Sequence, residues 1–184
     1  MNLPNKLTVL RILLVPVFMG ALFLRHDLSG YSTILALIVF VGAAVTDSLD
    51  GYLARKHKTV TKFGKILDPV ADKLLISAAL ISFVALGEIS AWAALIIIGR
   101  ELAVTGLRVV TASEGKEISA NNWGKLKTTF QIIAIIAVLV DPDIIRFSWN
   151  IPQILIWVAV LITVYSGIIY FQEANIDYFQ EERG

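Results

Sequence analysis

The sequence contains no cysteine and only two histidines, His26 and His57. The lack of cysteine excludes disulfides, thiolate metal sites and a cysteine nucleophile, and two histidines argue against a histidine-rich zinc site. Charged residues are also scarce, at 17% of the 184 residues, and the net charge is only +1. Since no bulk field of positive charge is present, we expect no nucleic-acid partner.

Apolar residues are abundant: they make up 57% of the chain, and the mean hydropathy is +0.74. A soluble domain usually has about 45–50% apolar residues and about 25% charged ones. The excess apolar surface needs a lipid phase. The first apolar run, residues 7–24, is longer than the core of a signal peptide and no small-residue cleavage pattern follows it, so we expect it to be retained.

Six segments are apolar enough for a membrane span, which needs roughly 20 such residues. We predict an all-α polytopic membrane protein with six transmembrane helices in one bundle. The chain would be one domain over residues 1–184, with a polar cytoplasmic tail over 172–184. The predicted spans are residues 3–24, 31–55, 60–86, 89–111, 123–139 and 151–171.

The basic residues that lie between these spans or toward their ends are strongly biased to one side. Arg25 and Arg146 lie on one side, whereas the other carries Lys6, Arg11, Arg55, Lys56, Lys58, Lys62, Lys65, Arg108, Lys116, Lys125, Lys127 and Arg183. The positive-inside rule therefore predicts cytoplasmic termini and an integral protein of the cytoplasmic (inner) membrane.

Four aspartates interrupt the second and third apolar segments. Asp47 and Asp50 are spaced i, i+3, and Asp68 and Asp72 are spaced i, i+4. Each pair lies on one helix face, and two antiparallel helices joined by a short turn would bring the two faces together. These aspartates lie toward the cytoplasmic ends of their helices in the predicted topology.

A carboxylate cluster inside a membrane needs a counter-charge. Insertion of one such group costs about 2.5–3.5 kcal/mol, and neighbouring carboxylates repel one another. Hard divalent cations such as Mg²⁺ and Mn²⁺ prefer oxygen ligands. We therefore predict metal at Asp47, Asp50, Asp68 and Asp72, and four aspartates suit two ions.

Two glycines and an arginine accompany the aspartates. Gly51 lies one turn before Arg55, and Gly64 lies one turn before Asp68. Glycine in a helix costs about 1 kcal/mol relative to alanine, but it lets a ligand or a second helix approach closely. Arg55 could then bind a phosphate bidentately. A purely structural ion-pair network with Arg55, Lys65 and Lys73 would not account for these glycines.

The complete pattern resembles the motif of the CDP-alcohol phosphotransferase family. The matching positions are Asp47, Asp50, Gly51, Ala54, Arg55, Gly64, Asp68 and Asp72, with eight residues between Arg55 and Gly64. The resemblance is closest to bacterial members that form phosphatidylglycerophosphate. It is supported by residues 2–8 with Arg11, and by residues 99–101, 105–108 and 124–128.

This resemblance implies two metal ions bridged by the aspartates, CDP-diacylglycerol as donor, glycerol 3-phosphate as acceptor, and a homodimer in the lipid bilayer. Asp72 would be the general base on the acceptor hydroxyl. The cytidine-diphosphate site would be lined by Asp50, Gly51, Ala54, Arg55, Gly64 and Asp68, together with Asn5 and Thr8. For Asn5 and Thr8, helix capping or packing remains an alternative.

The acceptor carries a phosphate, so its pocket should be basic. Our hypothesis is that Arg108, with Lys125 or Lys127, binds this phosphate. Arg100 either contributes to the same pocket or pairs with the neighbouring Glu101. Two other readings stay open: the same donor chemistry with an inositol phosphate or phosphatidylglycerol as acceptor, and a cation transporter, because intramembrane carboxylates can mark ion paths.

Overall fold

The computed structural model describes residues 3–26, 31–57, 62–113, 122–140 and 151–181. Within these ranges, the backbone alone is described for residues 3–5, 26, 47–57, 62–69, 72, 113, 122 and 174–181. The described part is all-α, with no strand. Its elements are α1 (Leu3–Phe23), the 3₁₀ turn η1 (Leu24–His26), α2 (Tyr31–His57), α3 (Lys62–Ala85), α4 (Ala91–Ser113), α5 (Asn122–Leu139) and α6 (Ile151–Glu181).

These helices confirm the predicted all-α class and nearly all of the predicted bounds. Every predicted end lies within two residues of the observed one except the last, because α6 continues to Glu181 rather than ending near residue 171. Residues 172–181 are polar, but they contain neither glycine nor proline. Hydropathy marks where a helix leaves an apolar environment, whereas propensity decides where it ends.

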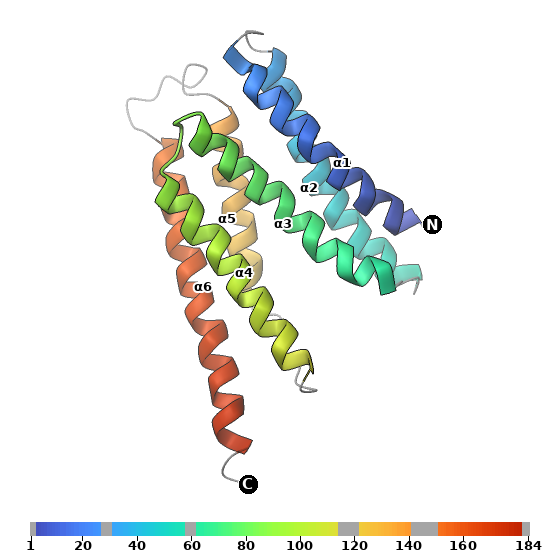
Figure 1. Cartoon of the computed structure of the whole chain (residues 1–184), viewed down its shortest axis with the longest axis vertical. Helices are drawn as coiled ribbons and strands as arrows, with labels where there is room; N and C mark the ends of the chain where they lie inside the picture. Colours follow the sequence, from blue (N-terminus) through green and yellow to red (C-terminus); the bar gives the residue numbers. More distant parts are fainter. Residues whose placement is uncertain (1–2, 27–30, 58–61, 114–121, 141–150, 182–184) are drawn as a thin grey trace. The chain divides into compact units, whose positions relative to one another are not determined.

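The first compact unit contains α1, η1, α2 and α3. The helix α1 contacts both α2 and α3, and α2 also contacts α3; α1 and α2 run antiparallel (Figure 1). At the centre of this unit, the rings of Phe18 and Phe40 lie 5.8 Å apart, centroid to centroid. The small residues Ala36 and Ala43 are fully buried on the same face of α2 as Phe40, which allows close helix packing.

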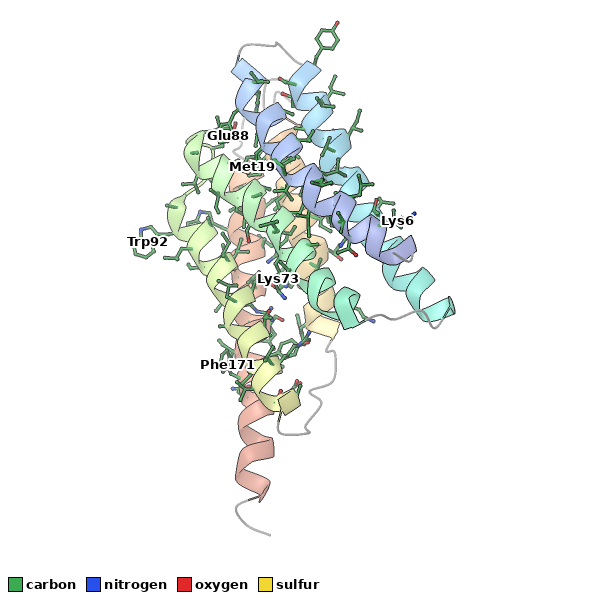
Figure 2. The ribbon with its side chains drawn as sticks, turned by 45° about the vertical axis from the view of Figure 1, so that its right-hand side comes forward. Lys6, Met19, Lys73, Glu88, Trp92 and Phe171 are labelled. Carbon is green, nitrogen blue, oxygen red and sulfur yellow. The ribbon has the colours of Figure 1, made fainter. Side chains whose placement is uncertain are left out.

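One end of this unit is fastened by an ion pair. Arg25 in η1 donates to Glu88 at 2.6 Å, and both side chains are largely buried. Glu88 lies in the turn that follows α3 (Figure 2). Gly87 has a φ of 74°, a left-handed conformation that favours glycine. The pair therefore links the end of α1 to the end of α3.

The second compact unit contains α4, α5 and α6. The helix α4 contacts α6, and side chains of α5 reach both of them. Trp123 on α5 meets Tyr165 on α6 edge to face, with ring centroids 4.8 Å apart. Gln131 on α5 donates a buried hydrogen bond of 3.1 Å to Thr163 on α6.

Many large apolar side chains of α4, α5 and α6 are exposed. The outer faces carry exposed large apolar residues, among them Trp92, which is 69% exposed and points away from α4 (Figure 2). The inner faces carry buried apolar residues, such as Ile97, Ile135 and Val160, together with buried polar ones, including Lys127, Gln131, Thr163 and Ser166. Large exposed apolar patches are typical of surfaces that contact lipid or a partner.

Two of the six helices are long and apolar enough to cross a membrane in the described part of the chain: they contribute Lys6–Phe23 and Ile151–Glu173. Shorter apolar stretches occur at Tyr31–Thr46 and Lys73–Ala85. The six-span arrangement and the single domain over residues 1–184 therefore stay predictions.

Candidate active site

The aspartate motif falls on two consecutive helices of the first unit. Asp47 and Asp50 lie in α2, and Asp68 and Asp72 lie in α3. These two helices contact each other. The side chains lie outside the described residues for the whole motif: Asp47, Asp50, Gly51, Ala54, Arg55, Gly64, Asp68 and Asp72. Their roles stay predictions, although the backbone confirms that each aspartate pair belongs to one helix.

Arg11 is almost completely buried in α1, with 1% of its surface exposed. It lies seven residues before Phe18, and position 47 lies seven residues after Phe40. Seven residues make about two helical turns, since one turn has about 3.6 residues. Because Phe18 contacts Phe40 across antiparallel helices, Arg11 is at the level of position 47. Arg11 is therefore a core residue beside the helix of the first aspartate pair.

Thr8 lies one turn before Arg11 and is also buried, whereas the side chain of Asn5 lies outside the described part. Burial agrees with the packing alternative for Thr8 and leaves its predicted contact with the nucleotide untested.

A metal ion would fit where several side chains offer suitable ligand atoms. Among the side chains that the structure describes, no group of three or more histidines, aspartates or glutamates is placed to hold an ion. The four motif aspartates offer only carboxylate oxygens, which is the ligand chemistry of Mg²⁺ and Mn²⁺. The residues present on α2 and α3 therefore fit a hard divalent cation.

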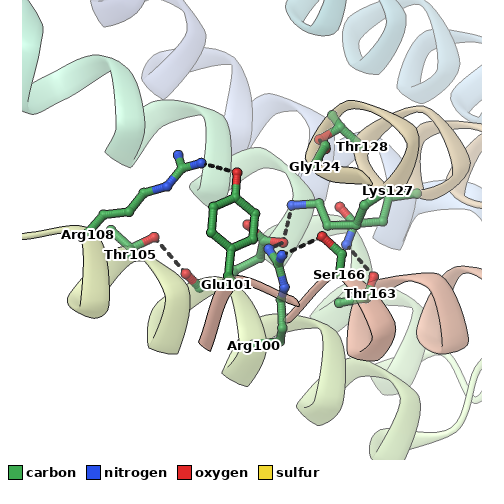
Figure 3. A network of polar contacts seen from close by, with 11 residues as sticks. Arg100, Glu101, Thr105, Arg108, Gly124, Lys127, Thr128, Thr163 and Ser166 are labelled. Carbon is green, nitrogen blue, oxygen red and sulfur yellow. Dashed lines mark hydrogen bonds and ion pairs between the residues drawn. The ribbon is translucent and has the colours of Figure 1, made fainter. Parts of the chain in front are cut away.

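In the second unit, polar residues recur at helical spacing on three helices. The stripe on α5 contains Lys127 and Gln131, with Gly124 on the same face, and that on α6 contains Thr163, Ser166 and Tyr170. Residues spaced by three, four or seven share a helix face. Contacts join these stripes to α4 (Figure 3). We call the following residues the polar cluster: Arg100, Glu101, Arg108, Lys127, Ser166 and Tyr170.

Arg100 is committed to contacts within the polar cluster. Its Nη2 donates to Ser166 Oγ at 2.7 Å, and its Nη1 lies 3.4 Å from Glu101 Oε1. Its side chain is only 10% exposed. Gly167 makes room for it, because a Cβ at that position would lie 3.1 Å from Arg100 Cγ. The predicted pairing of Arg100 with Glu101 is therefore observed.

Lys127 is also committed, because its ammonium group donates to the carboxylate of Glu101, and its side chain is only 8% exposed. Lys125 differs: it is exposed, and no ion pair involves it in the described part of the chain. One carboxylate thus serves Arg100 and Lys127, while Lys125 stays open to a ligand.

Arg108 lies further along α4 and is exposed to solvent. Its Nη2 donates to the hydroxyl of Tyr170, and its guanidinium carbon lies 4.8 Å from the centroid of the same ring. A guanidinium has five N–H donors, so most of them stay open. Of the four predicted acceptor-pocket residues, the contacts leave Arg108 and Lys125 available.

Sequence analysis missed the contribution of α6 to this region. Ser166, Gly167 and Tyr170 lie in the segment 151–171, for which the hydropathy predicts only an apolar span. Their signal was present: polar residues at positions 163, 166 and 170 follow a helical spacing within an otherwise apolar helix. Such a stripe indicates a face that packs against other polar helices.

Comparisons with known proteins extend over nearly the whole chain. A family model described as CDP-alcohol phosphatidyltransferase matches residues 1–165. A Bacillus subtilis protein named CDP-diacylglycerol–glycerol-3-phosphate 3-phosphatidyltransferase is 45% identical over 184 residues, which cover 94% of each chain. A Haemophilus influenzae protein of the same name is 40% identical over 179 residues, covering 95% of this chain and 94% of its own. A Rickettsia felis protein, also of that name, is 35% identical over 173 residues, covering 93% and 94%.

Proposed function

Because the chain belongs to the CDP-alcohol phosphatidyltransferase family, we propose that it transfers the phosphatidyl group of CDP-diacylglycerol to glycerol 3-phosphate. The products are phosphatidylglycerophosphate and CMP, and the reaction belongs to phospholipid biosynthesis. The observation that carries this proposal is the 45% identity, over 94% of each chain, to a relative named for this reaction. The complete aspartate motif from Asp47 to Asp72 supports it.

The motif aspartates Asp47, Asp50, Asp68 and Asp72 would hold divalent metal, as Mg²⁺ or Mn²⁺ and as two ions. When bound, the metal neutralises the pyrophosphate and stabilises the departing CMP. The support for this assignment is the all-carboxylate donor set on two contacting helices. Asp50 and Asp68 also belong to the proposed nucleotide site, with Gly51, Ala54, Arg55, Gly64, Asn5 and Thr8.

Asp72 acts as the general base in this proposal. The acceptor hydroxyl oxygen bonds to the phosphorus nearest the diacylglycerol, and the bond from that phosphorus to the bridging oxygen breaks. CMP leaves with the bridging oxygen, and the hydroxyl proton passes to Asp72. A carboxylate is suited to this role only when it is ionised before the reaction.

The acceptor phosphate is bound by Arg108 and Lys125, in our proposal, and Arg100 and Lys127 support the fold around them. This division follows from the contacts: Glu101 already pairs with the two buried cations, Arg100 and Lys127, whereas Arg108 and Lys125 are exposed. Guanidinium binds phosphate through paired hydrogen bonds.

The membrane arrangement that we propose has six spans, with both termini and the active site on the cytoplasmic side of the inner membrane, in a homodimer. The exposed large apolar residues of α4, α5 and α6 support it. The mean hydropathy of such a helix can fall below that typical of a membrane span, because its inner face carries charged residues such as Arg100 and Glu101. Trp92 begins the outer face of α4, a position typical of the membrane interface.

The first experiment measures CMP release from CDP-diacylglycerol by the purified protein in detergent, with Mg²⁺ or Mn²⁺. Glycerol 3-phosphate, myo-inositol 1-phosphate and phosphatidylglycerol are supplied in parallel. We expect release only with glycerol 3-phosphate, and loss of release in Asp72→Asn. The matched control is Asp177→Asn, which removes a carboxylate outside the motif.

Release with another acceptor alone would keep the donor chemistry and refute the named product. If folded protein releases no CMP with any of the three acceptors, the proposed reaction is refuted. If Asp72→Asn keeps full activity, the proposed role of Asp72 as the base is refuted. In the first of these cases, metal uptake into vesicles would test the transport alternative.

A further inference from the structure

Tyr170 on α6 lies at the meeting point of the second unit's three helices. Its hydroxyl accepts a hydrogen bond from Arg108 Nη2 on α4. Its ring also faces two guanidinium groups, because the ring centroid lies 4.8 Å from the guanidinium carbon of Arg108 and 5.5 Å from that of Arg100. A cation within about 6 Å of an aromatic ring is attracted to its face. Tyr170 thus holds Arg108 in two ways.

The third helix, α5, contributes Gly124, which has no side chain. A Cβ at Gly124 would lie 3.3 Å from the hydroxyl oxygen of Tyr170 and 3.8 Å from Cε2 of its ring. The hydroxyl therefore lies directly against the α5 backbone, one residue before Lys125. Glycine at this position leaves the space that the tyrosine hydroxyl occupies, and it brings the Lys125 backbone close to the bond between Tyr170 and Arg108.

The two arginines that share this ring differ in how many of their N–H donors remain available to a ligand. Arg100 is largely buried and bonded to Ser166 and Glu101. Arg108 is exposed, and its hydrogen bond to Tyr170 uses one of its five donors. A flexible arginine that is fixed at one edge and open at the other loses less conformational entropy when an anion binds.

We propose that Tyr170 is a positioning residue for the acceptor: it pre-orients the Arg108 guanidinium to bind the phosphate of glycerol 3-phosphate, and Gly124 provides the space for its hydroxyl. This inference rests on the proposed function, which it deepens by naming the device that sets acceptor affinity. Tyr170 does not touch the reacting atoms. Its effect should therefore be on binding of the acceptor and not on the chemical step.

The test compares steady-state kinetics of full-length wild type, Tyr170→Phe and Tyr165→Phe in mixed micelles. Tyr165 is a matched control because it lies on the same helix and its ring contacts Trp123. We expect Tyr170→Phe to raise the KM for glycerol 3-phosphate about tenfold, equivalent to about 1.4 kcal/mol. The kcat and the KM for CDP-diacylglycerol should change less than about twofold, within the scatter typical of a substitution that leaves transition-state contacts intact. Tyr165→Phe should behave as wild type.

A double-mutant cycle with Arg108→Ala separates positioning from folding. If Tyr170 acts through Arg108, Tyr170→Phe should have no further effect on kcat/KM for the acceptor in the Arg108→Ala background. An unchanged acceptor KM in Tyr170→Phe would overturn the inference. So would a fall in kcat with a rise in both KM values, or an equal effect in both backgrounds. A wild type that releases CMP without glycerol 3-phosphate dependence would instead overturn the proposed function, and this inference with it.

Discussion

Replacing Gly167 by alanine tests whether the polar cluster holds Arg100 rigidly. The added Cβ would lie 3.1 Å from Arg100 Cγ and 3.4 Å from its Nε. Ordinary contacts between carbon atoms are about 3.5–4.0 Å, so Arg100 would have to move by several tenths of an ångström. Its movement is restricted, because Ser166 and Glu101 bind its two terminal nitrogens.

The magnitude follows from two opposing effects. Alanine in place of glycine stabilises a helix interior by about 1 kcal/mol, whereas overpacking a well-packed site costs about 1–3 kcal/mol. Gly106 on α4 offers the matched control, since no atom lies within 4 Å of its would-be Cβ. The helix term is common to both substitutions. We therefore expect Gly167→Ala to be less stable than Gly106→Ala by about 1–3 kcal/mol.

The assay is reversible unfolding of the purified variants in mixed detergent and SDS micelles. Repeating both substitutions in an Arg100→Ala background removes the atoms that clash, so the difference between the glycine variants should disappear. If Gly167→Ala is as stable as Gly106→Ala with Arg100 present, the side chain yields freely and the polar cluster does not fix it.

Three further predictions concern buried partners and metal. Gln131→Leu should lower the free energy of unfolding by about 1–3 kcal/mol, because it leaves the buried Thr163 hydroxyl without its donor, and adding Thr163→Val should recover most of this loss in the same unfolding assay. Lys127→Met should destabilise the fold by a similar amount because Glu101 loses a partner, whereas Lys125→Met should leave stability unchanged and raise the acceptor KM; the reverse pattern would refute our assignment of the two lysines. EDTA should abolish CMP release, and added Mg²⁺ should restore it; activity that persists in EDTA would contradict a metal-dependent reaction.

The sequence was sufficient to predict the helices, because a long apolar run has few alternatives to a helix in lipid. Its one wrong bound, the end of α6, arose where the polar residues 172–181 continue the helix without an apolar environment. The placement of each aspartate pair on one helix could also be predicted. Asp47 and Asp50 are close enough in sequence for helical geometry to relate them, and so are Asp68 and Asp72.

The basic residues of the second unit could not be sorted by sequence alone. Arg100, Arg108, Lys125 and Lys127 have the same charge and lie in similar segments. Their difference depends on which of them meets Glu101 or Tyr170, and such hydrogen bonds join residues up to 62 positions apart. Tertiary packing supplies that information, so the distinction between a buried support and an exposed ligand needed the structure.

The length of α6 has a consequence for how the protein can be observed. Its 31 residues make a rod of about 46 Å at about 1.5 Å per residue, compared with a hydrocarbon layer of about 30 Å. If the apolar stretch Ile151–Glu173 fills that layer, the final turns form a stalk in water. A fluorophore attached at residue 181, where α6 ends, would then be carried on this stalk, away from the lipid headgroups. Its distance from the bilayer, measured by quenching with labelled lipids, would report the depth and tilt of α6.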